Sequence, residues 1–383
     1  MGCAVVCVVG TRPEAVKMAP VVLRLRREGS GFAVRLVTTG QHRELLDRAL
    51  ADFGLASDDD LDVMRPGQSL PDLTARALVA VGDALGRHRP DIVLAQGDTT
   101  TVLCAALASY YRQIPFCHVE AGLRTGLPYA PFPEEKNRVL AAHLATIHFA
   151  PTAAAKANLL AEGIDTASVH VTGNTVIDAL LMISRQPVAL PVAPPTERFV
   201  LVTAHRREHF GSPLEQICLA LCDLLDRNPG LSVIYPVHPN PNVREVVTNR
   251  LGGHDRIRLI DPVGYREFVA LMKAAFAILT DSGGVQEEGP SLGKPVLLLR
   301  EATERPEAVS AGTVRLVGPN REAIVAAIEE LHHQPEVYEQ FARVANPYGD
   351  GWASERIARV LAARFGLDPG QIPEGMPEGL RSQ

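Results

Sequence analysis

The sequence predicts an α/β protein made of two doubly wound domains that face a central cleft. Short apolar runs alternate with longer stretches of helical period along the whole chain of 383 residues. Such runs are typical of buried parallel strands, and the stretches between them suit crossover helices. A Pro-rich segment at 186–197 (QPVALPVAPPTE) interrupts the alternation and is typical of a linker. We therefore expect two α/β domains of similar size.

The first domain is expected to span residues 1–185. Its predicted strands are the apolar runs Val5–Val9, Val34–Thr38, Ile92–Ala95, Phe116–Val119 and Ile147–Ala150. Amphipathic stretches predict crossover helices near Glu14–Arg27, Arg43–Phe53, Leu73–Arg87, Thr99–Tyr111 and Lys136–Ala145. Pro, Gly or a short polar residue marks most of the joints between them.

The same pattern resumes in the second domain, which is expected to span residues 186–352. Its predicted strands are Phe199–Thr203, Val233–Pro236, Ile257–Ile260, Ala275–Thr280, Val296–Leu299 and Val314–Val317. Residues 368–383 are rich in Pro and Gly and are expected to form a loose tail.

The composition argues against several classes of partner. The net charge is −6 with both signs scattered, so a nucleic-acid partner is not expected. No apolar run has the length of a membrane span, so no membrane partner is expected. The six cysteines are dispersed without a Cys-x-x-Cys pair, which favours buried reduced thiols and a cytoplasmic location.

Unusual polar residues follow the predicted strands of the first domain. Arg12 and Lys17 are expected on one helical face suited to phosphate or carboxylate, although a solvated face is the commoner explanation. Asp98 and Glu134 stand at predicted helix starts, where capping and dipole effects are alternatives. Together with Glu120 they would supply acid–base pairs for proton transfer at carbon.

In the second domain, the stretch 277–288 (AILTDSGGVQEE) predicts a nucleotide-binding turn between a strand and a helix. Gly283 and Gly284 let the backbone approach phosphate oxygens, and the helix N-terminus favours their charge. Glu288, one turn further on, could reach a ribose hydroxyl. The alternative is an ordinary joint in which Ser282 only caps the helix.

The segment His205–His209 formally matches the H-x-x-E-H pattern of zinc proteases. It leaves a strand rather than lying in a helix, and no third ligand has a sensible spacing, so no metal site is expected. His205 suits an anion contact at a strand end. Because GxGxxG after the first strand and GxxxxGK[ST] are both missing, neither a nicotinamide enzyme nor a P-loop NTPase is expected.

Several long blocks resemble the bacterial non-hydrolysing UDP-N-acetylglucosamine 2-epimerases, in order from Val5 to about Gly351. These blocks are GTRPEAVKMAP, GQHRELLD, QGDTTTVL, HVEAGLRTG, PFPEEKNR, TGNTVIDALL, AHRREHFG, YPVHPNPNVRE, DSGGVQEEGPSLGKP, ERPEAVSAGTVRLVG and NPYGDG. The resemblance implies two Rossmann-like domains of the glycosyltransferase B type with UDP in the cleft. It also implies a homodimer and a C-terminal helix (353–367, with Ala353–Phe365 the fitting stretch) that packs back on the first domain.

The family's reaction interconverts UDP-GlcNAc and UDP-ManNAc through elimination of UDP to a 2-acetamidoglucal, followed by re-addition. By resemblance, the catalytic residues are Asp98, Glu120, Glu134 and His205. The implied substrate-binding residues are Arg12, Lys17, Phe268, Ser282, Gly283, Gly284, Glu288 and Arg305. No cofactor and no catalytic metal are implied.

Some family members are activated by a second UDP-GlcNAc beside the substrate. The corresponding contacts here are Gln41, His42, Glu134, Arg206 and His238. This chain has Gly67 where allosteric members tend to carry arginine, and Glu44 where they tend to carry glutamine. Since a lost arginine removes a strong charge-assisted contact, we expect a weakened or absent allosteric requirement.

Four other functions remain open at this point. A glycosyltransferase could use the same nucleotide-binding turn, and a hydrolysing epimerase would release free ManNAc. A 2-epimerase could also act on a diacetamido uronic-acid sugar nucleotide. A UDP-sugar sensor without catalysis would need the nucleotide-binding turn but not the three carboxylates.

Overall fold

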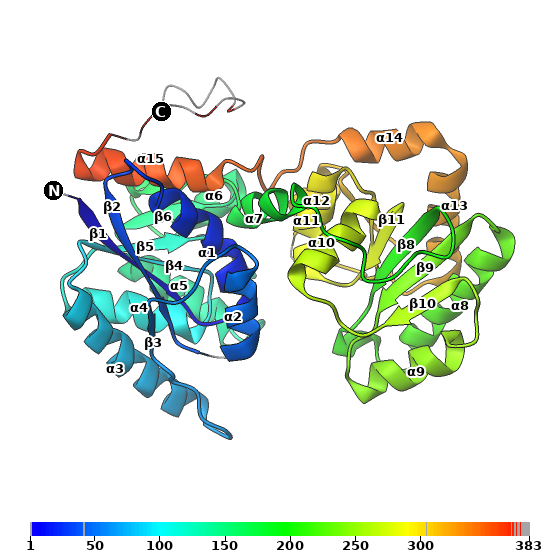
Figure 1. Cartoon of the computed structure of the whole chain (residues 1–383), viewed down its shortest axis with the longest axis horizontal. Helices are drawn as coiled ribbons and strands as arrows, with labels where there is room; N and C mark the ends of the chain where they lie inside the picture. Colours follow the sequence, from blue (N-terminus) through cyan, green and yellow to red (C-terminus); the bar gives the residue numbers. More distant parts are fainter. Residues whose placement is uncertain are drawn as a thin grey trace. The chain divides into compact units, whose positions relative to one another are not determined.

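The computed structural model describes residues 2–40, 43–303 and 305–368, together with residues 370, 373 and 376. Packing contacts divide the chain into two units, which are Met1–Ala179 with Tyr348–Gln383 (unit 1) and Leu180–Pro347 (unit 2). Each unit contains one parallel sheet with helices in the connections (Figure 1). The predicted α/β fold class is therefore confirmed.

Unit 1 has a seven-stranded sheet in the order β3-β2-β1-β4-β5-β6-β7. Its strands are β1 (Cys3–Val9), β2 (Phe32–Thr38), β3 (Asp59–Asp60), β4 (Ile92–Gln96), β5 (Phe116–Val119), β6 (Ile147–Ala150) and β7 (Val169–Val171). Its helices are α1 (Arg12–Leu25), α2 (Arg43–Ala51), α3 (Leu70–His88), α4 (Thr100–Tyr111), α5 (Glu134–Leu144), α6 (Ala153–Ala161), the 3-10 helix η1 (Thr166–Ser168) and α15 (Ala353–Phe365). Helix α7 (Thr175–Ser184) runs from unit 1 into unit 2.

Unit 2 has a six-stranded sheet in the order β10-β9-β8-β11-β12-β13. Its strands are β8 (Arg198–Thr203), β9 (Leu231–Pro236), β10 (Ile257–Ile260), β11 (Ala277–Thr280), β12 (Val296–Leu298) and β13 (Val314–Leu316). Its helices are η2 (Arg207–His209), α8 (Ser212–Arg227), α9 (Pro241–Leu251), α10 (Tyr265–Ala274), α11 (Gly283–Glu288), η3 (Gly289–Leu292), α12 (Pro306–Ser310), α13 (Arg321–His333) and α14 (Pro335–Arg343).

The apolar runs form strands because both faces of each sheet are covered. β1 is a Val-rich run, and all its residues but one are buried. In unit 2, a core of Val, Leu and Ile side chains joins β8, β9 and β11 to α8 and α13. Local signals set the ends of several helices: Thr11 and Glu14 form a capping box at the start of α1, and Gly366 ends α15 with a positive φ.

Two strands of unit 1 are not predicted from the sequence. β3 consists of two acidic residues and carries no apolar signal, and β7 is a three-residue edge strand. Elsewhere the boundaries shift by a few residues; the strand expected from Ala275 begins at Ala277. The six cysteines are free, and all but Cys222 are buried, as predicted.

The last helix of the chain belongs to unit 1, where α15 packs against α1. Asp178 caps α15, accepting hydrogen bonds from Ala353 N (3.1 Å) and Ser354 N (2.7 Å). Arg24 of α1 forms an ion pair with Glu355 of α15.

Each strand order reverses once, and such a reversal is where a ligand is expected to bind. In unit 1 the reversal lies between β1 and β4, and in unit 2 between β8 and β11. Open parallel sheets bind ligands outside the carboxyl ends of the strands at such points. The loops that follow these four strands are therefore the expected ligand-binding ends of the two sheets.

Candidate active site

A buried carboxylate, Glu14, joins the loops at the reversal in unit 1. Its Oε2 accepts hydrogen bonds from Gly10 N (2.6 Å) and Thr11 N (2.8 Å), and its Oε1 accepts one from the Thr99 hydroxyl. The pKa of Glu14 is raised to about 7, and burial is the main cause. The hydrogen bonds lower the pKa, whereas the charge of Asp98 contributes to the increase. The loop that carries Asp98 is thus fixed to the start of α1.

Glu120 follows β5 and is surrounded by donors. Lys17 Nζ lies 2.7 and 2.8 Å from its two carboxylate oxygens. Gln96, the last residue of β4, donates to Oε2, and Asn174 Nδ2 donates to Oε1 at 3.0 Å. The backbone of Glu120 has φ +62°, which is uncommon for a residue with a side chain. The carboxylate is therefore cation-paired and held in one orientation.

Asp98 contacts helix α5, which begins with Glu134. Asp98 lies one residue before Thr99, the N-cap of α4, and pairs with Arg138 of α5. Glu134 is the first residue of α5, as expected from sequence, and Arg138 lies one turn further along the same face. Asp98 is therefore an ion-pair partner rather than a helix cap, and its side chain stays 31% exposed.

Arg12 is the first residue of α1, whereas Lys17 lies in its second turn. Five residues correspond to about 140° around an ideal helix, so the expectation that both cations share one face is wrong. Lys17 is directed to Glu120, and Arg12 is half-buried. The predicted residues Gln41 and His42 lie outside the described residues.

In unit 2, Asp281 follows β11 and organises the loop after β8. Its Oδ2 accepts hydrogen bonds from His205 N (2.7 Å), Arg206 N (2.8 Å) and His209 Nδ1 (3.1 Å). Its Oδ1 lies 3.0 Å from His205 Nδ1. Burial alone would raise the pKa of Asp281, but the contacts with both histidines and the Arg206 amide outweigh it and hold the pKa well below its usual range.

His205 also stacks on His238, which follows β9. Their ring centroids are 5.6 Å apart and the rings are 15° from parallel. His238 Nδ1 accepts a hydrogen bond from Asn240 N at 3.2 Å, so its Nε2 points away from that turn. Burial and the neighbouring His205 lower the pKa of His238. Arg206 is fixed separately, since its Nε donates to Asp281 O at 3.0 Å.

The predicted phosphate-binding turn opens helix α11. Ser282 is the N-cap residue, but its side chain makes no capping hydrogen bond. Arg305 forms an ion pair with Glu287 (2.6 Å) and lies over Gly283: a Cβ on Gly283 would be 2.7 Å from Arg305 Nη1. At Gly284 a Cβ would meet only Glu288 Oε2, at 3.7 Å. Glycine at 283 thus permits the close approach of Arg305.

Glu288, at the end of α11, is buried and oriented by α10. The Tyr265 hydroxyl donates to Glu288 Oε1 at 2.7 Å. Phe268 lies one turn after Tyr265 on α10 and is half-buried. The two helices thus bring the predicted ribose contact and the predicted uracil contact to the same part of unit 2.

Residues that hold the predicted site residues were not assigned from the sequence. They are Gln96, Arg138, Asn174, Tyr265 and Asp281. Gln96 and Asp281 offered a signal, because a polar residue at the end of a buried strand requires a partner.

The His and Glu side chains of the H-x-x-E-H segment have partners elsewhere in unit 2. His205 and His209 both face Asp281, and Glu208 pairs with Arg300. Within the described part of the chain, no three His, Cys, Asp or Glu side chains are grouped so that they could hold a metal ion. None of the helices described is long and apolar enough to cross a membrane.

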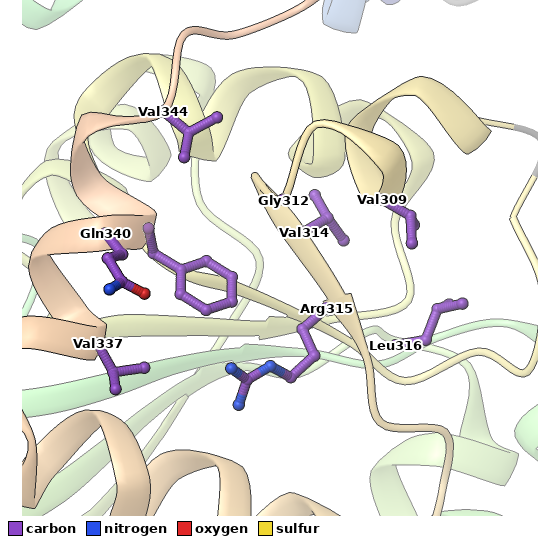
Figure 2. A pocket seen from close by; sticks show the side chains of 9 residues that line it. Val309, Gly312, Val314, Arg315, Leu316, Val337, Gln340 and Val344 are labelled. Carbon is purple, nitrogen blue, oxygen red and sulfur yellow. The ribbon is translucent and has the colours of Figure 1, made fainter.

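A separate groove of about 430 Å³ lies in unit 2 between the edge strand β13 and α14 (Figure 2). Its lining is mostly apolar: Val309, Gly312, Val314, Arg315, Leu316, Val337, Gln340, Phe341 and Val344. No predicted site residue contributes to this lining. The groove is therefore distinct from the candidate site.

The family model for UDP-N-acetylglucosamine 2-epimerase matches residues 4–362. The chain is similar to the UDP-N-acetylglucosamine 2-epimerase of Escherichia coli (strain K12), with 49% identity over 93% of this chain and 98% of the relative. It is also similar to the crystal structure of UDP-GlcNAc 2-epimerase from Neisseria meningitidis bound to UDP-GlcNAc (45% identity, TM-score 0.83, 94% of this chain and 100% of the other). The solved glycotransferase of kitacinnamycin, at 14% identity and TM-score 0.63, shares the fold alone.

Proposed function

The chain belongs to the UDP-N-acetylglucosamine 2-epimerase family, and from this premise we propose that it interconverts UDP-N-acetylglucosamine and UDP-N-acetylmannosamine. The observation that carries the proposal is the set of carboxylates at the strand ends of unit 1. Glu120 is held by Lys17, and Asp98 is held by Arg138. A protein that only bound a UDP-sugar would need the nucleotide contacts of unit 2 but not these carboxylates.

The proposed reaction begins with removal of the proton from C2 of the sugar. The C–H electron pair forms a C1=C2 double bond while the C1–O bond breaks and its electrons leave with UDP, which gives a 2-acetamidoglucal. UDP then adds back to C1, and a proton reaches C2 from the opposite face. Inversion requires two different acid–base groups, for which Asp98, Glu120 and Glu134 are our candidates.

Cations and backbone amides would retain the departing UDP. Arg12, Lys17, His205 and Arg305 would supply positive charge, and the N–H groups of the α11 turn (Ser282, Gly283, Gly284) would bind phosphate. Glu288, whose Oε1 accepts from Tyr265, would bind the ribose hydroxyls. Phe268 would cover the uracil.

We also propose that activation by a second UDP-GlcNAc is weak or absent. Gly67 is exposed with φ +68°, a conformation that an arginine would adopt only with strain. The loop is therefore shaped for glycine where allosteric relatives tend to carry arginine. Rates that depend hyperbolically on UDP-GlcNAc would agree with this proposal, and strongly sigmoidal rates would contradict it. A residual allosteric site would use Gln41, His42, Glu134, Arg206 and His238.

A homodimer is part of the proposal. Large apolar side chains are exposed on the neighbouring helices α3, α4 and α5: Val79 (64%), Tyr110 (63%), Tyr111 (66%) and Leu140 (50%). Exposed large apolar side chains on adjoining helices favour protein–protein contact. Light scattering should give twice the chain mass of 41.3 kDa. The double variant Val79→Glu, Tyr111→Glu should be a monomer. An unchanged dimer would show that the interface lies on another surface.

A cytoplasmic location is the remaining part of the proposal. All six cysteines are free thiols, which suits a reducing compartment. Fractionation of cells that express the tagged chain tests the location.

The decisive experiment is proton NMR of the purified chain with UDP-GlcNAc in deuterated water. Growth of UDP-ManNAc signals with deuterium at C2 is expected. Release of free ManNAc would indicate a hydrolysing epimerase. No change in the spectrum, with UDP binding shown separately, would indicate a glycosyltransferase or a diacetamido substrate.

A further inference from the structure

A pocket of about 1090 Å³ lies in unit 1 between the edge strand β7 and helix α15, and it is large enough for a small molecule. β6 contributes only its first residue, Ile147, whereas the predicted UDP-sugar contacts of unit 1 follow the carboxyl ends of strands. None of the predicted site residues that the structure describes lines this pocket. It is therefore separate from the candidate active site.

The lining of this pocket is basic. Four cations face one carboxylate, Asp165; the cations are Lys156, Arg356, Arg359 and Arg364. The three arginines lie within an arc of about 140° around α15, so one face of this helix carries them. His170 also lines the pocket and is neutral at pH 7, because burial lowers its pKa.

Two of the arginines are held by carboxylates. Arg356 donates to Asp350 at 2.8 and 2.6 Å, so its charge is compensated. Arg359 Nε lies 2.8 Å from Glu355, which also pairs with Arg24. One carboxylate thus serves two guanidinium groups, and positive charge remains beside the pocket.

Lys156 and Arg364 are the cations that a ligand can use. Within the part of the chain that the structure describes, neither forms an ion pair. Lys156 Nζ donates to Val169 O of the edge strand at 3.2 Å, which leaves its other N–H bonds for a ligand. Arg364 is exposed and brings a planar fork of donors. Two such cations in one pocket favour an anion with more than one charge.

We propose that this pocket is a second anion site, in which Lys156 and Arg364 bind the phosphate group of a soluble phosphorylated small molecule. Ammonium and guanidinium groups bind phosphate oxygens through charge-assisted hydrogen bonds. Val360, Ala363 and Met376 also line the pocket and would contact the carbon part of the ligand; Met376 is 2% exposed. The proposal goes beyond the epimerisation proposed above and does not depend on it.

A soluble ligand is favoured over a lipid headgroup by the surroundings of the pocket. Among the described lining residues, Val171 is the one large apolar residue that is exposed, at 44%. A membrane surface would require a wider apolar rim.

Pyrophosphate is the probe, and saturating UDP occupies the nucleotide contacts of unit 2. Calorimetry at low salt should give a dissociation constant below about 1 mM for pyrophosphate and the wild-type chain. The double variant Lys156→Gln, Arg364→Gln should bind at least about tenfold more weakly, because charge-assisted hydrogen bonds are lost. Absence of binding to the wild type, or equal affinity in the variant, would overturn the proposal.

The matched control is Arg35→Gln, Arg48→Gln. It removes the same charge from exposed positions on β2 and α2, and β2 lies near the opposite edge of the sheet from β7. The control should bind pyrophosphate within about twofold of wild type. An equal loss in the control and the pocket variant would show an effect of net charge alone and overturn the site. Arg364→Gln by itself changes only an exposed side chain, so it provides the test if the double variant does not fold; it should weaken binding at least about threefold.

Two further probes test the class of ligand. Citrate carries its charge on carboxylates and should bind at least about tenfold more weakly than pyrophosphate; equal binding would overturn the assignment to phosphate. Vesicles that contain phosphatidic acid should retain the wild type and the double variant equally. Retention that requires Lys156 and Arg364 would overturn the soluble ligand.

Discussion

Replacement of Glu14 by glutamine should make the chain more stable at neutral pH. Glu14 is 2% exposed, and burial raises the pKa of its carboxyl from 4.5 to about 7. Gln keeps the shape and can keep the contacts: its carbonyl oxygen can accept from the Gly10 and Thr11 amides, and its NH₂ can donate to the Thr99 hydroxyl. The substitution therefore removes a buried charge with little change in packing.

The magnitude follows from the difference between folded and unfolded pKa. Below pH 4.5 the carboxyl is protonated in both states and contributes no pH dependence. Between pH 4.5 and 7 the unfolded chain releases the proton and the folded chain retains it, so wild-type stability falls as pH rises. Above pH 7 the folded state carries the buried charge, at a cost of about 3 kcal/mol relative to low pH.

Urea unfolding from pH 4.5 to 8 measures the effect. The single tryptophan, Trp352, lies in unit 1 with Glu14, so its fluorescence reports the relevant unit. The difference in free energy of unfolding between Glu14→Gln and wild type should grow by about 3 kcal/mol across this range. Glu28→Gln, which removes an exposed carboxylate just after α1, should give a flat difference. Growth below about 1 kcal/mol for Glu14→Gln, or a change of opposite sign, would refute the reasoning.

Three further predictions address the candidate site. Asp98→Asn should bind UDP within about threefold of wild type in calorimetry but lower turnover by about 10² or more; a near-normal rate would remove Asp98 from the mechanism. Gly283→Ala should weaken UDP binding about tenfold, because its Cβ would lie 2.7 Å from Arg305 Nη1. Gly284→Ala makes only an ordinary 3.7 Å contact and should lose less affinity than Gly283→Ala. Equal affinities for the two alanine variants would argue against this site. Lys17→Met should lower the free energy of unfolding by about 2 to 3 kcal/mol, since its carboxylate partner stays buried; urea unfolding that shows a loss under 1 kcal/mol would contradict a structural ion pair.

The hydrophobic periodicity and the polar residues at strand ends predicted the fold class and most of the strands. Apolar runs such as Val5–Val9 are long enough to identify buried strands, and the polar residues that follow them lie at the points where both sheets reverse. The two edge strands of unit 1, β3 and β7, escaped prediction, whereas those of unit 2 were predicted. β3 is held by pairing with β2 rather than by apolar side chains.

The supporting partners of the site could not be predicted, because sequence spacing does not show which distant segments meet. Asn174 reaches Glu120 across 54 positions, and Asp281 reaches the His205 amide across 76. Each partner is specified only once the sheet has brought the two strand ends together. The error about Arg12 and Lys17 has a different cause: five residues correspond to about 140° around an ideal helix, so the two side chains leave α1 in different directions.

The return of the chain to unit 1 has a consequence for biosynthesis. Unit 2 is continuous in sequence and can be completed as soon as residue 347 has left the ribosome, whereas unit 1 has to wait for α15. Until then Asp178 lacks the amides of Ala353 and Ser354, and Arg24 lacks Glu355. A nascent chain arrested before residue 353 would expose the surface of α1 that α15 covers. The N-terminal half of this protein is therefore the last to be finished and the part for which a chaperone has the longest opportunity to bind.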